Sequence, residues 1–481
     1  MAAVAQIVTG VDGQVIADLN QLDPVTGAGT MLGDRSKIDV AAVELAKQQE
    51  NRAVVWSATT EPETLVTRGL TVPLVVFAED PADLPARVAA LNAATRKPFW
   101  LKVRRHGSVV PVYLRCWPAV PRWSTTLVGV GASGIAVGEL VTQSDPYGYG
   151  SRVDIPPAEI TQDPVQPTAW VMDVNNVAGD SPTPLCFSTS DQTLLAEDHG
   201  LLFAVRRRGN PAALGPIVAQ AETATLRPLG RNAPTMMTIT GDAALSNGGG
   251  VSVVFADSGG VDSLGQLTIP GSVFFAGAEA PGVYRLLVRA RRSGSSAGLE
   301  HNIRAAVGPL TMDALFTASG GDTRVVDMGL VQVPIGQPGY HAAPHVSGGA
   351  VAPDVTLLVW KTSAGTGRLD VDWVALVPAD EGQGIAYGAA GGIATGRWWH
   401  LDGYDHTPRV FTGYPYEPGT YSAGQLPGAQ LRFVGGVPMV GPGSNRLWVI
   451  GGLQVGSQGS WPPTKVITMQ VSYWPRYGWL A

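Results

Sequence analysis

The stretch TRGLTVPLVVFAEDPADLPARVAAL, residues 67–91, decides the fold of the N-terminal part of the chain. Apolar residues at positions 72, 74 and 76 alternate with other residues, the period-two pattern of a strand with one buried face. Asp80 and Pro81 then form a helix start, because Asp accepts hydrogen bonds from free N–H groups and Pro fits the first turn. We therefore expect a strand that leads directly into a helix.

The spacing that follows predicts a helix over residues 81–95. Leu84, Val88 and Leu91 lie four and three residues apart and form one apolar stripe. A second helix is expected over 36–49. Alternating patterns after the first helix predict strands at 99–103, 109–117 and 135–142. A helix between strands of one sheet packs on a sheet face, so the first 150 residues should form one unit of sheet and helix.

The composition extends the β prediction to the rest of the chain. The 481 residues include 60 Gly and 37 Pro, and only 15% are charged, so a helical bundle is disfavoured. With 45% hydrophobic residues and 13 Trp the chain can bury sizeable cores. A net charge of −6 argues against a nucleic-acid partner. Cys116 and Cys186 form no CxxC pair and are expected to be free and buried.

The sequence contains neither a secretion signal nor a membrane-spanning stretch. No basic segment followed by an apolar core begins the chain, and no run of about 18 apolar residues occurs. We therefore expect synthesis and folding in a cytoplasm, without membrane insertion.

A proline-rich linker at 150–168 separates the first unit from a region without helical periodicity. Gly, Pro, Asn and Ser punctuate the strand-like runs beyond it, as in β-sandwich or jelly-roll modules. These runs cover 169–174, 185–188, 201–206, 236–239, 251–255, 282–290, 324–333, 355–360, 369–377, 430–434, 446–450 and 465–473.

No catalytic signature stands out. GVGASG at 129–134 fits the dinucleotide pattern GxGxxG, but a strand pattern follows it where that motif needs a helix, which favours a turn. HLDGYDH at 400–406 contains two His and two Asp, yet its spacing matches no standard metal set. A carboxylate pair for glycoside hydrolysis stays open, since such pairs meet only in space. We expect no enzymatic activity and assign no catalytic or cofactor-binding residue.

Three basic clusters, at 104–106, 206–208 and 289–292, lie at expected strand ends. Contact with an anionic polymer is one interpretation. The favoured one is that they are solvated charges that discourage edge-to-edge pairing of strands.

Several stretches together resemble the distal tail proteins, or minor tail proteins, of long-tailed phages that infect actinobacteria. In the first 150 residues these are 67–76, 83–91, 98–101, 118–123 and 145–150. NVAGDSPTPL at 176–185 is similar to the entry of the family's galectin-like sandwich, and GVPMVGPGSNRL at 436–447 and VSYWPRY at 471–477 are similar to its exit. In the second of these, Asn445 can bond back to the backbone of the turn.

The region between resembles carbohydrate-binding jelly rolls that begin with "AE" and end with "DW". The matching positions are QAETA at 220–224, GVYRLLVRA at 282–290 and LDVDWVALVP at 369–378. The resemblance implies a structural calcium held by Glu222 and Asp372, because hard carboxylate oxygens suit this ion. A glycan-binding residue cannot be singled out from this resemblance. The aromatic residues available to stack on a sugar are Phe274, Phe275, Phe316, Tyr340 and Trp360.

These observations predict a mainly β chain of four segments. Residues 1–155 form a ring-forming β-sandwich with one packed helix, and 156–216 begin a galectin-like β-sandwich. Residues 217–382 form an inserted, carbohydrate-binding-module-like jelly roll, and 383–481 complete the interrupted sandwich and supply the closing strand.

The resemblance implies a virion protein of the siphovirus tail tip, or baseplate. We expect a hexameric ring that joins the tail tube to the tip. Its partners would be the major tail tube protein, the tape-measure protein and the tail-tip hub and other minor tail proteins. A host cell-surface polysaccharide is a further expected ligand in host attachment. The alternative is a stand-alone cell-envelope protein that binds or hydrolyses carbohydrate.

Overall fold

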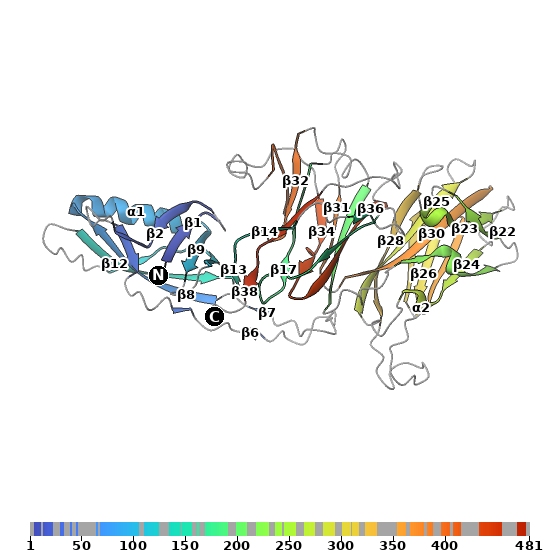
Figure 1. The fold of residues 1–481 in the computed structure, drawn as a ribbon, viewed down its shortest axis with the longest axis horizontal. Helices are drawn as coiled ribbons and strands as arrows, with labels where there is room; N and C mark the ends of the chain where they lie inside the picture. The colour runs from blue at the N-terminus through green and yellow to red at the C-terminus, as the bar shows by residue number, and fades with distance from the viewer. Residues whose placement is uncertain are drawn as a thin grey trace.

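The fold is mainly β, as predicted, and three β domains follow one another along the long axis of the molecule (Figure 1). The computed structural model describes residues 4–10, 13–22, 29–32, 39–40, 45–46, 64–65, 68–104, 110–124, 134–145, 147–155, 161–162, 169–190, 199–208, 218–229, 236–242, 245–255, 264–274, 282–293, 301–308, 310–316, 323–333, 354–361, 366–379, 382–387, 396–404, 407–414, 432–454 and 469–477.

The N-terminal domain is built on one long sheet in the order β2-β1-β9-β10-β12-β8-β4-β3. Its strands are β1 (Val4–Val8), β2 (Val15–Asp18), β3 (Asn20–Leu22), β4 (Gly29–Leu32), β5 (Asp39–Val40), β8 (Arg68–Ala78), β9 (Phe99–Arg104), β10 (Val112–Cys116), β11 (Arg122–Trp123), β12 (Gly134–Ser144) and β13 (Gly148–Tyr149). The longest pairing joins β8 and β12 along eleven residues each, so this pair forms the backbone of the domain.

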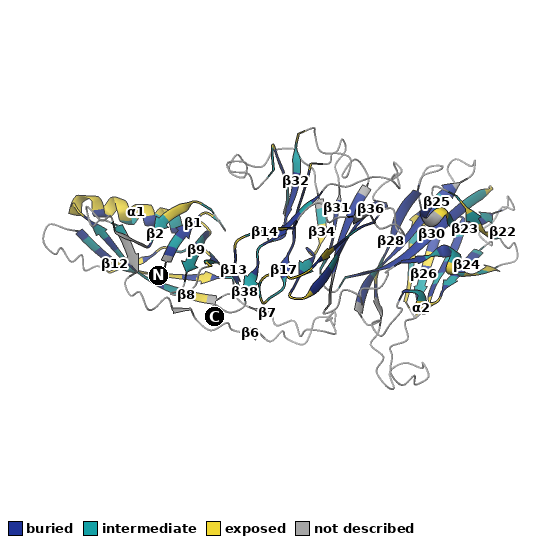
Figure 2. Ribbon diagram, viewed as in Figure 1, coloured by how far each residue is buried: buried dark blue, intermediate teal, exposed yellow. Residues whose placement is uncertain are grey.

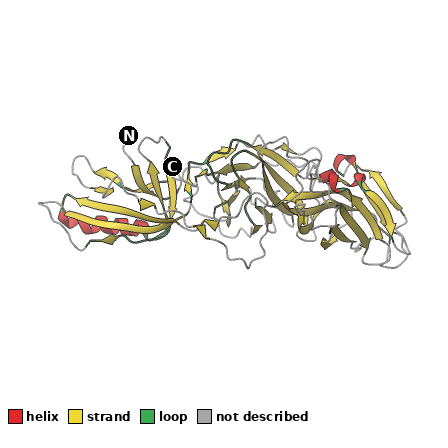
Figure 3. Cartoon of the chain, turned by 90° about the horizontal axis from the view of Figure 1, so that it is seen from below, coloured by secondary structure: helices red, strands yellow, loops and turns green. Residues whose placement is uncertain are grey.

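Helix α1 (Leu84–Thr95) lies against one face of this sheet (Figure 3). The Asp80 carboxylate accepts a hydrogen bond from the Ala82 N–H at 2.8 Å and so caps the 3-10 turn Pro81–Asp83, which leads into α1. The α-helix itself begins three residues later than the predicted start at 81. Leu84 and Leu91 are buried in the domain core, so the predicted stripe does face the sheet. The helix predicted over 36–49 is wrong where that segment is described, because β5 and β6 (Leu45–Ala46), which pairs with β7 (Thr64–Leu65), are strands.

The middle domain is a sandwich of two sheets that share a core around Trp170, Phe187, Phe203 and Trp399. One sheet runs β14-β37-β18-β32-β33, and the other runs through β15, β16, β36, β19, β31 and β34. The bounds are β14 (Val153–Ile155), β15 (Thr161–Gln162), β16 (Ala169–Val174), β17 (Thr183–Pro184), β18 (Cys186–Thr189), β19 (His199–Arg208), β31 (Gln383–Tyr387), β32 (Trp398–Asp402), β33 (Thr407–Phe411), β34 (Arg432–Gly435), β35 (Met439–Val440), β36 (Ser444–Gln454) and β37 (Gln470–Tyr473).

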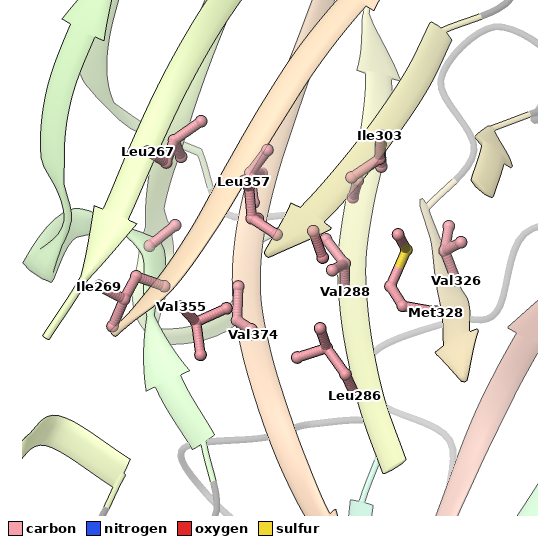
Figure 4. Packing of buried hydrophobic residues seen from close by; sticks show 14 of the residues in the cluster. Leu267, Ile269, Leu286, Val288, Ile303, Val326, Met328, Val355, Leu357 and Val374 are labelled. Carbon is pink, nitrogen blue, oxygen red and sulfur yellow. The ribbon is translucent and has the colours of Figure 1, made fainter. Parts of the chain in front are cut away.

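The third domain is inserted between β19 and β31 and is a second sandwich. Its sheets are β21-β24-β29-β26-β27 and β22-β23-β30-β25-β28, the latter with β20 on β30. The second sheet continues into the middle domain, because β28 pairs in parallel with β36. Apolar side chains from both sheets interlock between them, with Leu357 and Val288 among those labelled in Figure 4. The bounds are β20 (Val218–Gln220), β21 (Thr225–Leu229), β22 (Met236–Gly241), β23 (Gly249–Phe255), β24 (Leu264–Ile269), α2 (Gly271–Phe274), β25 (Gly282–Ser293), β26 (His301–Val307), β27 (Leu310–Phe316), β28 (Thr323–Val333), β29 (Val355–Lys361) and β30 (Gly367–Pro378).

A separate apolar layer joins the inserted domain to the middle domain. Trp373 on β30 and Leu287 on β25 pack there against Trp448 on β36 and Leu202 on β19. These residues are buried although they lie on the outer faces of their own sandwiches. Figure 2 shows that β30 and β36, which carry two of them, are drawn mostly in the colour of buried residues. The inserted domain is therefore packed against the middle domain and is not joined to it by its two chain connections alone.

The closing strand β38 (Arg476–Tyr477) leaves the middle domain and pairs with β13 of the N-terminal domain. Arg476 lies among three tyrosine rings, with its guanidinium carbon 4.8 Å from the centroid of Tyr147, 5.7 Å from Tyr149 and 5.3 Å from Tyr404. Two of these rings belong to the N-terminal domain and the third follows β32. The cation–π contacts of Arg476 therefore hold two domains together.

Replacing Arg476 should loosen this junction. We expect Arg476→Ala to lower the free energy of unfolding by about 2 kcal/mol, since the guanidinium is partly buried among rings. Limited proteolysis at the junction and thermal unfolding measure the effect. Arg446→Ala is the matched control, because Arg446 forms an ion pair with Asp173 at the surface, and such pairs are worth about 0–1 kcal/mol. Equal effects of the two substitutions would contradict the assignment.

Candidate functional site

The predicted calcium ligands, Glu222 and Asp372, lie at a gap in the pairing along one side of strand β30. β23 pairs with β30 up to Val371, and β20 pairs with it from Trp373 onward, so Asp372 falls between the two partners. Glu222 belongs to the 3-10 turn Ala221–Thr223 that directly follows β20. Topology thus brings the first and last strands of the domain together at this point.

The side chain of Asp372 is fully buried and its oxygens are occupied. Oδ2 is ion-paired with the guanidinium of Arg289 on β25, which is buried as well. Oδ1 accepts a hydrogen bond from the Ser246 backbone N–H at 2.9 Å and lies 2.6 Å from the Ser246 hydroxyl. That hydroxyl is also 3.0 Å from Oε1 of Gln220.

Burial dominates the electrostatics of this cluster. It raises the pKa of Asp372, and the Arg289 guanidinium and the Ser246 hydrogen bonds act against this rise. Burial likewise lowers the pKa of Arg289, and the charge of Asp372 opposes that shift. The pKa of Glu222 is raised, first by burial and then by the negative charge of Asp372. The two carboxylates are therefore near enough to interact.

This arrangement does not fit a calcium ion. Calcium takes six to eight oxygen ligands, whereas a buried guanidinium already neutralises Asp372. Of the four carboxylate oxygens of Glu222 and Asp372, Oε2 of Glu222 is buried without a hydrogen-bond partner among the described residues. Within the described ranges, no group of three or more His, Cys, Asp or Glu side chains could hold a metal.

Arg289 also corrects the interpretation of the basic clusters. Solvated strand ends were expected at 289–292, but Arg289 is 0% exposed and Arg292 is 7% exposed. Arg291 is half-buried and paired with Asp242 at 2.6 Å. In a domain with few charges, these arginines serve as internal counter-charges.

Among the candidate sugar-stacking aromatics, the described residues single out Trp360. Phe274 and Phe316 are buried in the jelly-roll core, and 275 and 340 lie outside the described residues. Trp360 lies partly exposed on the outer face of β29, with the guanidinium of Arg304 5.5 Å from its ring centroid.

Polar groups border Trp360 on the same face. Asn302 is its cross-strand neighbour on β26, so a side-chain amide lies beside the ring. Arg304 binds Asp313 through two contacts of 2.6 and 2.8 Å, and this hydrogen bonding lowers the pKa of the Asp313 carboxyl.

The remaining motifs have structural roles where they are described. Cys116 and Cys186 are buried thiols, as predicted, and neither forms a disulfide within the described residues. His400, from the HLDGYDH segment, is buried and its Nδ1 lies 2.8 Å from the Ser188 hydroxyl; residues 405–406 lie outside the described part, as do 341 and 345. β12 begins at Gly134, so a strand follows the GxGxxG segment, as the turn interpretation requires.

A site that the sequence did not reveal lies on the outer face of β8 and β12. The side of this pair away from α1 carries an apolar row, in which Val75 faces Val137 and Phe77 faces Ile135 across the strands. Val137 is 45% exposed and Val141 is 43% exposed. Uncovered apolar faces of this kind mark interaction surfaces.

Acid should destabilise the inserted domain through His301. Its imidazole is buried with neither ring nitrogen hydrogen-bonded within the described residues, and burial, with the charges of Arg292 and Lys361, lowers its pKa to about 4. The unfolded chain takes up the proton near pH 6.5, so stability is complete above that pH and is lost as the pH falls toward 4.

We expect the free energy of unfolding to fall by about 2 kcal/mol between pH 7 and pH 5 because of His301. The substitution His301→Phe should abolish this fall. Urea unfolding at each pH measures it. Unchanged pH dependence in His301→Phe would refute the assignment.

No family model matches the chain, and no curated protein matches it. Solved structures with similarity to it include phage tail proteins and carbohydrate-binding modules. The Dit protein of phage SPP1 is 13% identical with a TM-score of 0.19, and the match covers 78% of this chain and 99% of that one. The baseplate of phage P2 in its activated conformation gives 9% identity and a TM-score of 0.21 over 77% of this chain and 98% of that one. The module TmCBM61 in complex with β-1,4-galactotriose gives 10% identity and a TM-score of 0.21 over 36% and 99% of the two chains. At such low identities and TM-scores, none of these similarities assigns a function.

Proposed function

We propose that the chain is a structural protein of a phage tail tip, in which six copies close into a ring through their N-terminal domains. The observation that carries this proposal is the uncovered apolar face of β8 and β12 around Val137 and Val141. A free monomer would leave this face in water, whereas a cyclic assembly buries it against the next copy. The sequence resemblance to distal tail proteins supports the same reading.

In this role the ring joins the tail tube to the tip. Its neighbours would be the major tail tube protein, the tape-measure protein and the tail-tip hub and other minor tail proteins. The protein would be made in the host cytoplasm and become part of the virion. No catalytic step is proposed. Among the described residues, no helix has the length and apolarity that crossing a bilayer requires.

Charge on the β8–β12 face should break the ring. We expect Val137→Lys with Val141→Lys to weaken self-association by roughly 100-fold, because two lysines would be desolvated in the interface. Mass photometry and negative-stain imaging report the number of copies. Ile239→Lys is the matched control, since Ile239 is 63% exposed on the inserted domain. A wild-type protein that stays monomeric at micromolar concentration would overturn the ring proposal.

A second role, presentation of a host-glycan site by the inserted jelly roll, is favoured by the position of Trp360. Sugar rings offer C–H groups that pack on an aromatic face, while neighbouring polar groups bind their hydroxyls. Trp360 with Asn302 and Arg304 supplies both kinds of group on one outer sheet face.

We expect Trp360→Ala to reduce binding to host cell-wall polysaccharide by at least about tenfold, through loss of the stacking surface. Pull-down with the insoluble polysaccharide measures it, in CaCl2 and in EDTA. Trp117→Ala is the control, because Trp117 is 48% exposed on the N-terminal domain. No binding by the wild type would leave the domain with an architectural role alone.

A further inference from the structure

Four oxygen-bearing side chains lie close together where β30 changes its pairing partner. Gln220, Glu222, Ser246 and Asp372 come from three separate segments, and Asp372 is in contact with the positive charge of Arg289. Two carboxylates and one guanidinium leave the cluster with a formal charge of −1. The cluster lies at Asp372, between the last residue of β30 that pairs with β23 and the first that pairs with β20.

Backbone geometry is adapted to this cluster. The pairing of β25 with β30 shifts register between Arg289 and Ala290, and such a bulge re-aims the side chain beside it. Two glycines at the start of β23 leave room for Glu222 and for the backbone of β30. A Cβ at Gly249 would collide with Oε1 of Glu222, and a Cβ at Gly250 would lie 2.7 Å from the carbonyl oxygen of Val371.

Arg289 contributes to this cluster through its positive charge more than through its hydrogen bonds. Its Nη1 contacts Asp372, while its Nε and Nη2 are buried and have no hydrogen-bond partner in the part of the chain that the structure describes. If the role of this guanidinium were hydrogen bonding, all of its N–H groups would have acceptors, because buried donors usually do. A charge that balances Asp372 in a dry site needs only proximity.

We propose that the Arg289 guanidinium serves as the built-in cation of this site, so that the inserted domain folds without calcium, and that its removal opens a calcium site on Asp372, Glu222 and Gln220. Loss of the guanidinium changes the formal charge of the cluster from −1 to −2 and frees Oδ2 of Asp372. The neighbouring carboxylate of Glu222 has an oxygen, Oε2, that lacks a hydrogen-bond partner among the described residues. Hard oxygens with a double negative charge are the ligands calcium prefers. This inference concerns the inserted domain alone and does not depend on ring formation.

The experiment measures thermal unfolding of the full chain in millimolar CaCl2 and in EDTA, with bound calcium determined by elemental analysis after dialysis. For the wild type we expect identical melting temperatures and no bound calcium. For Arg289→Met we expect a melting temperature lowered by roughly 5 °C or more in EDTA, because Asp372 loses its partner, and partial recovery in CaCl2 with one ion bound.

Three variants on the same strands serve as controls. Arg289→Met combined with Asp372→Asn removes both charges and should lose the calcium response. Arg291→Met breaks a half-buried ion pair two residues away and should gain none. Arg289→Lys retains a cation and should also be indifferent to calcium, which keeps a test available if Arg289→Met does not fold. Stoichiometric calcium in the wild type, or a folded Arg289→Met without a calcium response, would overturn the inference.

Discussion

The apolar layer between the two sandwiches is the constraint on which the arrangement of the chain depends. An inserted domain has two links to its host, and links alone leave its orientation free. Here Trp373, Leu287 and Val377 meet Trp448 and Ile450 and are almost completely buried. Burying apolar surface contributes about 25 cal/mol per Å². The middle and inserted domains therefore behave as one body.

Buried charge within the inserted domain follows a simple pattern. Asp370 and Asp372 on β30 are both 0% exposed. Each is paired with an arginine, Asp370 with Arg368 and Asp372 with Arg289. Pairing is what makes carboxylates tolerable in such surroundings.

Local sequence patterns predicted most of the strands and the main helix. The elements that they did not predict depend on contacts between residues far apart in the sequence. Residues 169–174 were expected as a strand and are β16, and Asn445 donates to the carbonyl of Gly441 at 2.9 Å, which confirms the expected turn. The helix expected over 36–49 rested on irregular spacing and is wrong where described. The closing strand was expected to finish the middle domain, but its last two residues pair with β13 instead, a choice that depends on the tyrosines around Arg476.

The candidate site was predictable only in part. The proximity of Glu222 and Asp372 followed from a pairing of first and last strands, but nothing in the sequence places Arg289 against Asp372. That contact requires the bulge at Asp372 in β30, where the register against β25 shifts, and the Ser246 turn that covers the carboxylate. The outer face of β8 was equally hidden, because an alternating strand looks the same whether its second face is covered or bare.

The pairing of β38 with β13 has a consequence for the order of events during synthesis. Residues 148–149 leave the ribosome on the order of tens of seconds before residues 476–477, at ordinary translation rates. In that interval the N-terminal sheet lacks one of its strands and the three tyrosines lack their arginine. A nascent chain therefore carries an incomplete N-terminal domain. This domain reaches its final form only after translation has passed residue 477.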